Sequence, residues 1–269
     1  MPYLTVNNQH LFYRHNDREA DLPALVLIHG AGGRGGDWPF QWQQSGFVQS
    51  RGQPRWVTDF PLFFLDLPGH GNSEGPGRDS VLGYAEMVVA FVRELGLRRV
   101  VLAGHSLGGA IALQAALLDA SRLAGLVLIG TGAQMPVSEM ILTGLQTQFA
   151  ETVAMINKFA WRKNSAPVQR DVAVQHMVAT GSDTLYGDFY ACSQFDLRAE
   201  IGQIELPALV VVGAEDRMMP AAHSQFLVDH MPAAELLVIP EAGHFVMIEK
   251  AAKLSRELVA FLNRLRDEA

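Results

Sequence analysis

The sequence predicts an α/β domain built on a parallel sheet with helices on both faces. Short unbroken apolar runs, such as residues 24–28 and 126–129, alternate with longer stretches of helical periodicity. Unbroken apolar runs are typical of strands that are buried on both faces of a parallel sheet. The alternation of such strands with helices favours that sheet over an antiparallel sandwich.

Each predicted element follows from a local pattern. The predicted strands are residues 3–6, 10–14, 24–28, 62–66, 100–103, 126–129, 206–212 and 236–239. The first two flank Asn7 and Asn8 and are predicted to form a hairpin. The predicted helices are residues 37–50, 80–95, 110–119, a segment ending near 230, and 246–265. Asp37 as a cap and Pro39 in the first turn predict the start of the first helix.

The alternation breaks between residues 133 and 200, where helical stretches rich in large apolar side chains contain no convincing strand. A helical insertion of this size after a core strand indicates a lid over the carboxyl edge of the sheet. The alternative is a set of ordinary core helices. The predicted organisation is therefore a core domain of residues 1–132 and 201–269, with a lid of residues 133–200.

Composition excludes several classes of protein. The chain has 269 residues, of which 49% are hydrophobic, and a formal net charge of −7 without a Lys/Arg cluster, so nucleic acid is not an expected partner. The single cysteine, Cys192, cannot form an internal disulfide. We see no apolar signal core and no run near the ~20 residues of a membrane span. These features predict a cytoplasmic protein that does not bind membranes.

The segment that leads from residue 100 into the next helix carries the strongest chemical signal. Gly104, Ser106 and Gly108 form a G-x-S-x-G pattern between an apolar run and a helical stretch. Side chains at the two glycines would clash in so sharp a strand-to-helix corner, which pushes the serine hydroxyl out at the end of the strand. We predict that Ser106 is a nucleophile. The alternative is a serine in an ordinary tight turn.

A serine nucleophile needs a base, and the base needs an acceptor, at the same edge of the sheet. Among nine histidines, only His244 sits in a glycine turn after the last strand and downstream of a suitable acid. That acid is Asp216, which follows the preceding strand; its alternative role is a helix cap. The chain order Ser…Asp…His is a known order for such a triad. His29 and His70 are expected to make structural hydrogen bonds in their loops.

Two backbone N–H groups are predicted to form an oxyanion hole. Leu107 opens the helix after Ser106, and Ala31 lies in the glycine-rich loop that follows residues 24–28. The loop lacks the features of a phosphate-binding motif, and no Cys/His or carboxylate cluster has metal-ligand spacing. No cofactor and no metal are expected.

These motifs together resemble the α/β-hydrolases of the small esterase, lactonase and C–C hydrolase group. The resemblance spans nearly the whole chain, outside the lid, and rests on four motifs in order: His29-Gly30, Asp66-Leu67-Pro68-Gly69-His70-Gly71, Gly104-His105-Ser106-Leu107-Gly108-Gly109, and Asp216 with Gly243-His244. It implies an eight-stranded, mostly parallel sheet with the helical lid inserted after the sixth strand.

The predicted function is that of a serine hydrolase acting through an acyl-enzyme on a small, largely apolar ester, lactone or thioester. Met135, Trp161 and Phe245 are predicted to line the acyl pocket. Within the family, a serine nucleophile argues against dehalogenases and epoxide hydrolases, and Phe245 replaces the tryptophan usual in C–C hydrolases. Two alternatives stay open: C–C hydrolase, lyase or cofactor-free oxygenase chemistry on the same triad, and a ligand-binding receptor with weak residual hydrolysis. The sequence leaves the oligomeric state open.

Overall fold

A computed structural model of the protein describes residues 3–18, 22–43 and 56–267. In these residues eight strands form one sheet in the order β1-β2-β4-β3-β5-β6-β7-β8. The strands are β1 (Tyr3–Val6), β2 (Gln9–His15), β3 (Ala24–Ile28), β4 (Leu62–Leu65), β5 (Val100–His105), β6 (Leu123–Ile129), β7 (Ala208–Gly213) and β8 (Ala234–Ile239). The β1–β2 and β2–β4 pairs are antiparallel and the other pairs are parallel, so the predicted sheet is confirmed.

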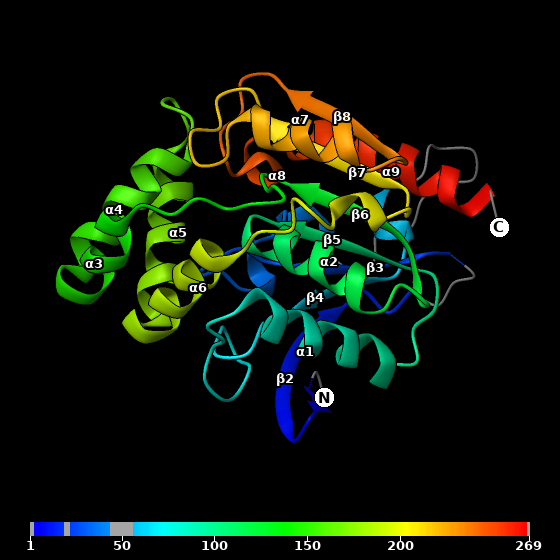
Figure 1. The fold of residues 1–269 in the computed structure, drawn as a ribbon, viewed down its shortest axis with the longest axis horizontal. Helices are drawn as coiled ribbons and strands as arrows, with labels where there is room; N and C mark the ends of the chain where they lie inside the picture. The colour runs from blue at the N-terminus through cyan, green and yellow to red at the C-terminus, as the bar shows by residue number, and fades with distance from the viewer. Residues whose placement is uncertain (1–2, 19–21, 44–55, 268–269) are drawn as a thin grey trace.

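Helices cover both faces of this sheet (Figure 1). The helices of the described chain are α1 (Val81–Glu94), α2 (Leu107–Leu118), α3 (Glu139–Thr147), α4 (Phe149–Ala160), α5 (Pro167–Thr180), α6 (Ser182–Gln194), α7 (Ala221–His230), α8 (Val246–Glu249) and α9 (Ala251–Asp267). Alternate residues of one strand explain the two layers. In β5, Val100 and Leu102 pack into the core beneath α1 and α2, whereas Val101 and Ala103 pack into the core beneath α9. The central strands β3, β5 and β7 are therefore buried at every position.

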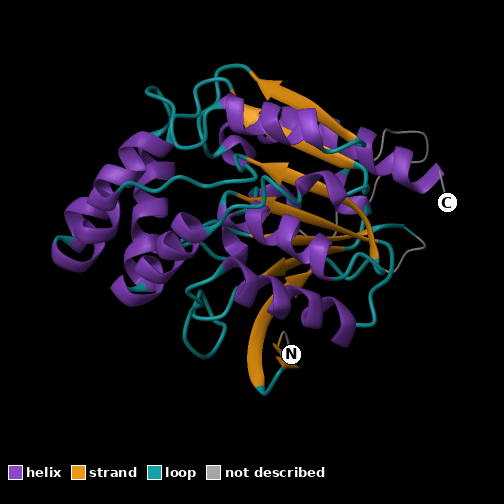
Figure 2. Cartoon of the chain, viewed as in Figure 1, coloured by secondary structure: helices purple, strands orange, loops and turns teal. Residues whose placement is uncertain are grey.

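The insertion, residues 133–200, contains α3 to α6 and lies between β6 and β7. Figure 2 shows the parallel strands pointing toward these helices, so the insertion stands over the carboxyl edge of the sheet. A small core of its own joins its helices through Leu145, Val153, Ile156, Met177, Leu185 and Phe189. Its movement as a lid stays a prediction.

The predicted helix over residues 37–50 is wrong where the structure describes it. Residues 35–37 and 40–42 form short 3₁₀ turns instead, and residues 44–50 lie outside the described chain. Asp37 caps the turn before it, because its Oδ2 accepts the N–H of Arg34 at 2.9 Å. Pro39 then takes an extended backbone conformation. The predicted final helix is divided into α8 and α9 at Lys250.

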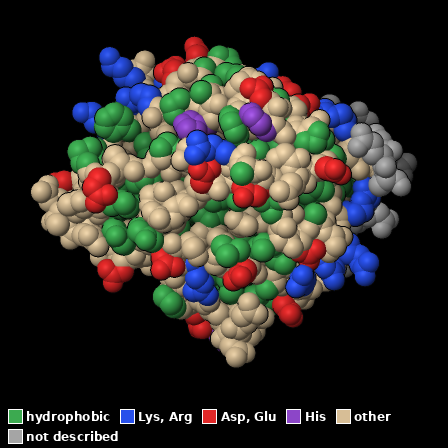
Figure 3. Space-filling view, viewed as in Figure 1, with side chains coloured by type: hydrophobic (Ala, Val, Ile, Leu, Met, Phe, Trp, Pro, Cys, Tyr) green, Lys and Arg blue, Asp and Glu red, His purple; other side chains and the backbone are tan. Residues whose placement is uncertain are grey.

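The surface gives no sign of a strongly charged field on the face in Figure 3, where acidic and basic side chains are interspersed. Across residues 3–18, 22–43 and 56–267, no helix combines the length and apolarity that crossing a membrane would require.

The corner between β5 and α2 predicts a strict requirement for glycine. A Cβ on Gly108 would clash with the backbone of Ile28 and His29. We expect Gly108→Ala to lower the free energy of unfolding by ~1–3 kcal/mol or more, because backbone cannot give way as a flexible side chain can. Gly202→Ala is the matched control: its Cβ would meet only the His230 carbonyl at 3.5 Å. Urea unfolding measures the free energy of unfolding of both variants, and an equal loss of stability in the two would contradict the expectation.

Candidate active site

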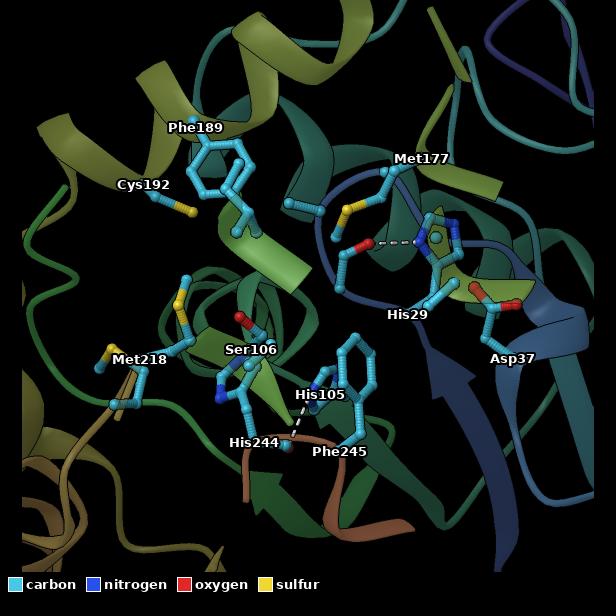
Figure 4. A pocket seen from close by; sticks show the side chains of 18 of the residues that line it. His29, Asp37, His105, Ser106, Met177, Phe189, Cys192, Met218, His244 and Phe245 are labelled. Atoms are coloured by element: carbon cyan, nitrogen blue, oxygen red, sulfur yellow. Dashed lines mark hydrogen bonds between the residues drawn. The ribbon is translucent and has the colours of Figure 1, made fainter. Parts of the chain in front are cut away.

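Ser106 occupies the corner that the sequence predicts. It follows β5 directly and precedes α2, with φ 54° and ψ −118°, a strained conformation for a residue other than glycine. A Cβ on Gly104 would clash with the backbone of Gly108, and one on Gly108 with β3. The two glycines therefore allow the helix to start close beneath the neighbouring strand. The hydroxyl of Ser106 is brought to the rim of a cavity (Figure 4).

Asp216 and His244 form a buried hydrogen-bonded pair. Nδ1 of His244 lies 2.8 Å from Oδ2 of Asp216, and the two side chains are 6% and 0% exposed. The other carboxylate oxygen accepts the N–H groups of Met218 and Met219, each at 2.9 Å. Asp216 thus closes its own turn and does not cap α7, which begins at Ala221. With Nδ1–H donated to Asp216, Nε2 of His244 is the nitrogen left to take a proton.

The loop after β6 makes room for this pair. A Cβ on Gly130 would lie 3.0 Å from Nδ1 of His244 and 3.3 Å from Oδ2 of Asp216, and Gly130 has φ +56°. The sequence offers no carboxylate in this loop, and the structure gives the physical reason for the glycine. The absence of a side chain at Gly130 leaves the space in which Asp216 and His244 meet.

The backbone of His244 is held from two sides. Its N–H donates to the carbonyl of Ala160 at the end of α4, at 2.7 Å. Its carbonyl accepts Nε2–H of His105 at 3.0 Å. Burial and the neighbouring His244 lower the pKa of His105 well below its ordinary value, so His105 is neutral. His105, which precedes Ser106, is therefore an uncharged support for His244.

The glycine-rich loop after β3 lies against Ser106. A Cβ on Gly30 would stand 3.3 Å from Cβ of Ser106. The Gly33 N–H donates to the Gly30 carbonyl at 3.1 Å and closes a tight turn, and Ala31 in that turn lines the cavity. Leu107 opens α2, where the first N–H groups of a helix have no intrahelical acceptor. Both residues predicted to supply oxyanion donors thus lie next to Ser106, and their role stays a prediction.

Two buried histidines support this loop, His29 in its neutral form and His70 as a cation. His29 donates Nδ1–H to the Gly30 carbonyl at 2.8 Å and accepts the Leu67 N–H at 3.0 Å, an arrangement that only a neutral ring can make. Burial and the charge of His70 lower the pKa of His29 to about 4. His70 has an acceptor at each ring nitrogen, the Pro68 carbonyl at 3.0 Å and Asp188 at 2.8 Å. Burial lowers its pKa, but Asp188 outweighs burial and raises it, so His70 is a cation.

Asp188 is the residue that the sequence analysis did not identify. Its side chain lies on α6, is 0% exposed, and bonds His70, Tyr84 and the Gly32 N–H. A signal was present in the sequence. Leu185, Asp188, Phe189 and Cys192 follow the i, i+3, i+4, i+7 spacing of a buried helix face. A carboxylate in such a stripe requires buried donors.

The cavity at Ser106 is largely apolar and opens to solvent, and the space within it, including this opening, is about 910 Å³. Ser106 and His244 both reach into it, beside Met177, Phe189 and Cys192 (Figure 4). Its described lining includes no Lys or Arg. The described chain also holds no group of three His, Cys, Asp or Glu side chains placed to bind a metal ion.

The predicted pocket residues are placed differently from one another. Met135 and Phe245 line the cavity. The prediction that Trp161 lines the pocket is wrong. Trp161 lies outside the described lining, and its ring stacks on the ring of Phe245 with a centroid separation of 4.5 Å. Being 2% exposed, it serves as the wall behind Phe245.

The chain matches the model of a family described as "Alpha/beta hydrolase family" over residues 25–257. It is 33% identical to the dihydrolipoyllysine-residue acetyltransferase component of the acetoin cleaving system of Pseudomonas putida, over 89% of this chain but only 63% of that protein. It is 27% identical to the 2-hydroxy-6-oxo-6-phenylhexa-2,4-dienoate hydrolase of Burkholderia cepacia, covering 97% of this chain and 95% of the relative. A solved thermophilic esterase is similar in structure, with a TM-score of 0.83 and 28% identity, covering 98% of this chain and 97% of the esterase.

The buried His70 predicts a pH dependence of stability. Its pKa in the folded protein is raised above the ordinary ~6.5. Its ion pair therefore stabilises the fold fully below ~6.5, and this contribution is lost as pH rises through the raised value. The titratable groups facing His70 are Asp188, Tyr84, His29 and Asp66.

The comparison of wild type with His70→Gln tests this sign. Glutamine keeps a donor but carries no charge. Denaturant unfolding should give a larger stability difference between the two proteins at about pH 6 than at about pH 9. A difference that stays constant or grows with pH would contradict a cationic His70.

Proposed function

Because this chain belongs to the alpha/beta hydrolase family, we propose that it is a serine hydrolase of small, neutral, largely apolar carboxylic esters, lactones or thioesters. The observation that carries the proposal is the buried Asp216–His244 pair, which opens into the same apolar cavity as the strained Ser106. Strained nucleophile, base and acid at one cavity are the requirements of acyl transfer through a covalent intermediate.

The geometry supports the following reaction. Ser106 Oγ attacks the substrate carbonyl while Nε2 of His244 takes the hydroxyl proton, since Nδ1–H is donated to Asp216. Asp216 stabilises the imidazolium that results. The N–H groups of Ala31 and Leu107 hold the oxyanion. His244 then gives its proton to the leaving group, and water, activated by the same base, releases the acyl group.

The cavity lining supports a neutral acyl group. Methionines, aliphatic residues and aromatic rings form most of the surface, and the described lining has no Lys or Arg. A charged group buried there would lose its hydration without gaining a partner, which costs several kcal/mol. The lining therefore favours a neutral acyl chain over a carboxylate-bearing one.

The second candidate is C–C bond hydrolysis on the same triad. The dienoate hydrolase of Burkholderia cepacia, which covers 97% of this chain at 27% identity, favours it. A dienoate, however, carries a carboxylate, for which the described cavity lining offers no cation. We therefore place ester, lactone or thioester hydrolysis first.

The reaction is tested with p-nitrophenyl esters from acetate to decanoate. We expect turnover that peaks at one acyl length, because the cavity has a fixed size, and a loss of ~10⁴-fold or more in Ser106→Ala. Near-normal turnover in that variant would refute the mechanism. If wild type cleaves no ester, labelling of Ser106 by a fluorophosphonate indicates a specialised substrate. Saturable ligand binding without labelling or turnover would favour a receptor and contradict the proposal.

The preference for a neutral acyl group is tested by pairing p-nitrophenyl hexanoate with the p-nitrophenyl monoester of adipate, which adds a terminal carboxylate. We expect kcat/KM to favour the hexanoate by ~100-fold or more, since the cavity leaves the carboxylate unpaired. Ile141→Arg places a cation at the half-buried wall and should narrow this ratio, whereas Ile141→Met should preserve it. Equal rates for both esters in wild type would show that neutrality is not required.

A further inference from the structure

Two helices of the insertion hydrogen-bond to the backbone of Gly32 in the glycine-rich loop. The Gly32 N–H donates to Oδ2 of Asp188 on α6 at 2.8 Å. The hydroxyl of Thr180, at the end of α5, lies 3.0 Å from the Gly32 carbonyl and 3.1 Å from the His176 carbonyl, so its one proton is shared between these two acceptors. Residues more than 140 positions away in the sequence thus fix the loop that follows β3.

These bonds complete a series that holds three consecutive peptide groups. The first contains the Gly30 carbonyl and the Ala31 N–H, and the carbonyl is held by His29 at 2.8 Å. The second contains the Gly32 N–H, held by Asp188, and the third contains the Gly32 carbonyl, held by Thr180. In a trans peptide the carbonyl and the N–H point in opposite directions. Holding this series therefore sets the direction of the Ala31 N–H.

The carboxylate of Asp188 is buried and fully hydrogen-bonded. Its side chain is 0% exposed, and its two oxygens accept three donors. Oδ2 takes His70 and Gly32, both at 2.8 Å, while Oδ1 takes the hydroxyl of Tyr84 at 2.6 Å. The cationic His70 balances its charge. A buried group with every oxygen engaged is a rigid reference point for the loop.

We propose that Asp188 is a positioning residue for the oxyanion hole and acts on it through the Gly32 N–H. The insertion in this way contributes to the chemical step as well as to the walls of the cavity. Thr180 secures the same peptide series from the opposite side. This inference rests on the proposed serine hydrolase function.

A purely structural role for the buried ion pair predicts a different result. Loss of stability alone lowers the amount of folded enzyme and leaves its kcat unchanged. Loss of oxyanion geometry lowers kcat and the affinity for a transition-state analogue in parallel, with little change in KM. The two roles are therefore separable by kinetics on folded protein.

The test compares Asp188→Ala, Asp188→Asn and Thr180→Val with Asn16→Ala as the control for lost buried hydrogen bonds. Asn16 is buried and bonds the Phe60 carbonyl at 2.8 Å and the Leu62 N–H at 3.0 Å, at the start of β4 and away from the Gly32 loop. We measure kcat and KM on the best p-nitrophenyl ester, the inhibition constant of the matching trifluoromethyl ketone, the rate constant of fluorophosphonate labelling, and unfolding by urea.

We expect kcat to fall ~10–100-fold in Asp188→Ala, since a small misplacement of a catalytic group costs up to ~100-fold. Asp188→Asn should recover part of this loss, because its amide oxygen can still accept the Gly32 N–H. Thr180→Val should lower kcat several-fold with KM unchanged. The affinity for the ketone should fall in proportion to kcat/KM in each case, and Asn16→Ala should keep the kcat of wild type.

Equal kcat values in Asp188→Ala and Asn16→Ala, or an effect on KM alone, would overturn the positioning role. If Asp188→Ala does not fold, Thr180→Val and Asp188→Asn decide by the same criteria. Wild type that neither cleaves esters nor reacts with the fluorophosphonate would refute the proposed function and the positioning role with it. Wild type that is active, with variants that behave like the control, would refute the positioning role alone.

Discussion

The site depends first on how closely the backbones approach one another at the carboxyl edge of the sheet. Gly108 lies where any Cβ would run into the backbone of Ile28 and His29 at the end of β3. That contact sets the distance between the Ser106 corner and the turn of residues 30–33, before any side chain contributes. Backbone contacts are stiff because no rotamer can relieve them. The relative position of the proposed nucleophile and oxyanion loop is thus a property of the chain path.

The insertion is attached to the loops of the candidate site at points far apart in the sequence. The Ala160 carbonyl at the end of α4 accepts the His244 N–H at 2.7 Å, and Asp188 in α6 accepts the Gly32 N–H at 2.8 Å. Trp161 adds a stacked ring behind Phe245. A rigid swing of the whole insertion would break these contacts. Any movement as a lid therefore has to leave the end of α4 and the middle of α6 in place if the site is to keep its geometry.

The candidate site could be predicted from the sequence because functional residues in parallel α/β sheets lie in the loops at the carboxyl ends of the strands. Ser106, Asp216 and His244 each follow a recognisable apolar run, and the structure brings Asp216 and His244 into contact. The hydrogen bond between Asp188 and the Gly32 N–H was not predicted, because the apolar pattern of a helix does not show which distant residue its buried side chains contact. The prediction for Trp161 failed for the same reason. Its indole packs against Phe245, and of these two residues only Phe245 lines the cavity. Local pattern predicts elements, whereas long-range contacts decide what each buried side chain touches.

The charge states of the buried histidines follow one logic. A proposed base must become a cation during the reaction, and a second cation beside it would oppose that change. His105, with its ring 4.7 Å from His244, is kept neutral by burial and by His244 itself. It still supports the base, because a neutral imidazole can donate one hydrogen bond. The histidine whose charged form is favoured is His70, which is paired with Asp188 and separated from the cavity lining by the neutral His29. Positive charge is thus favoured at His70, where it supports the loop, and disfavoured at His105, beside the proposed base His244.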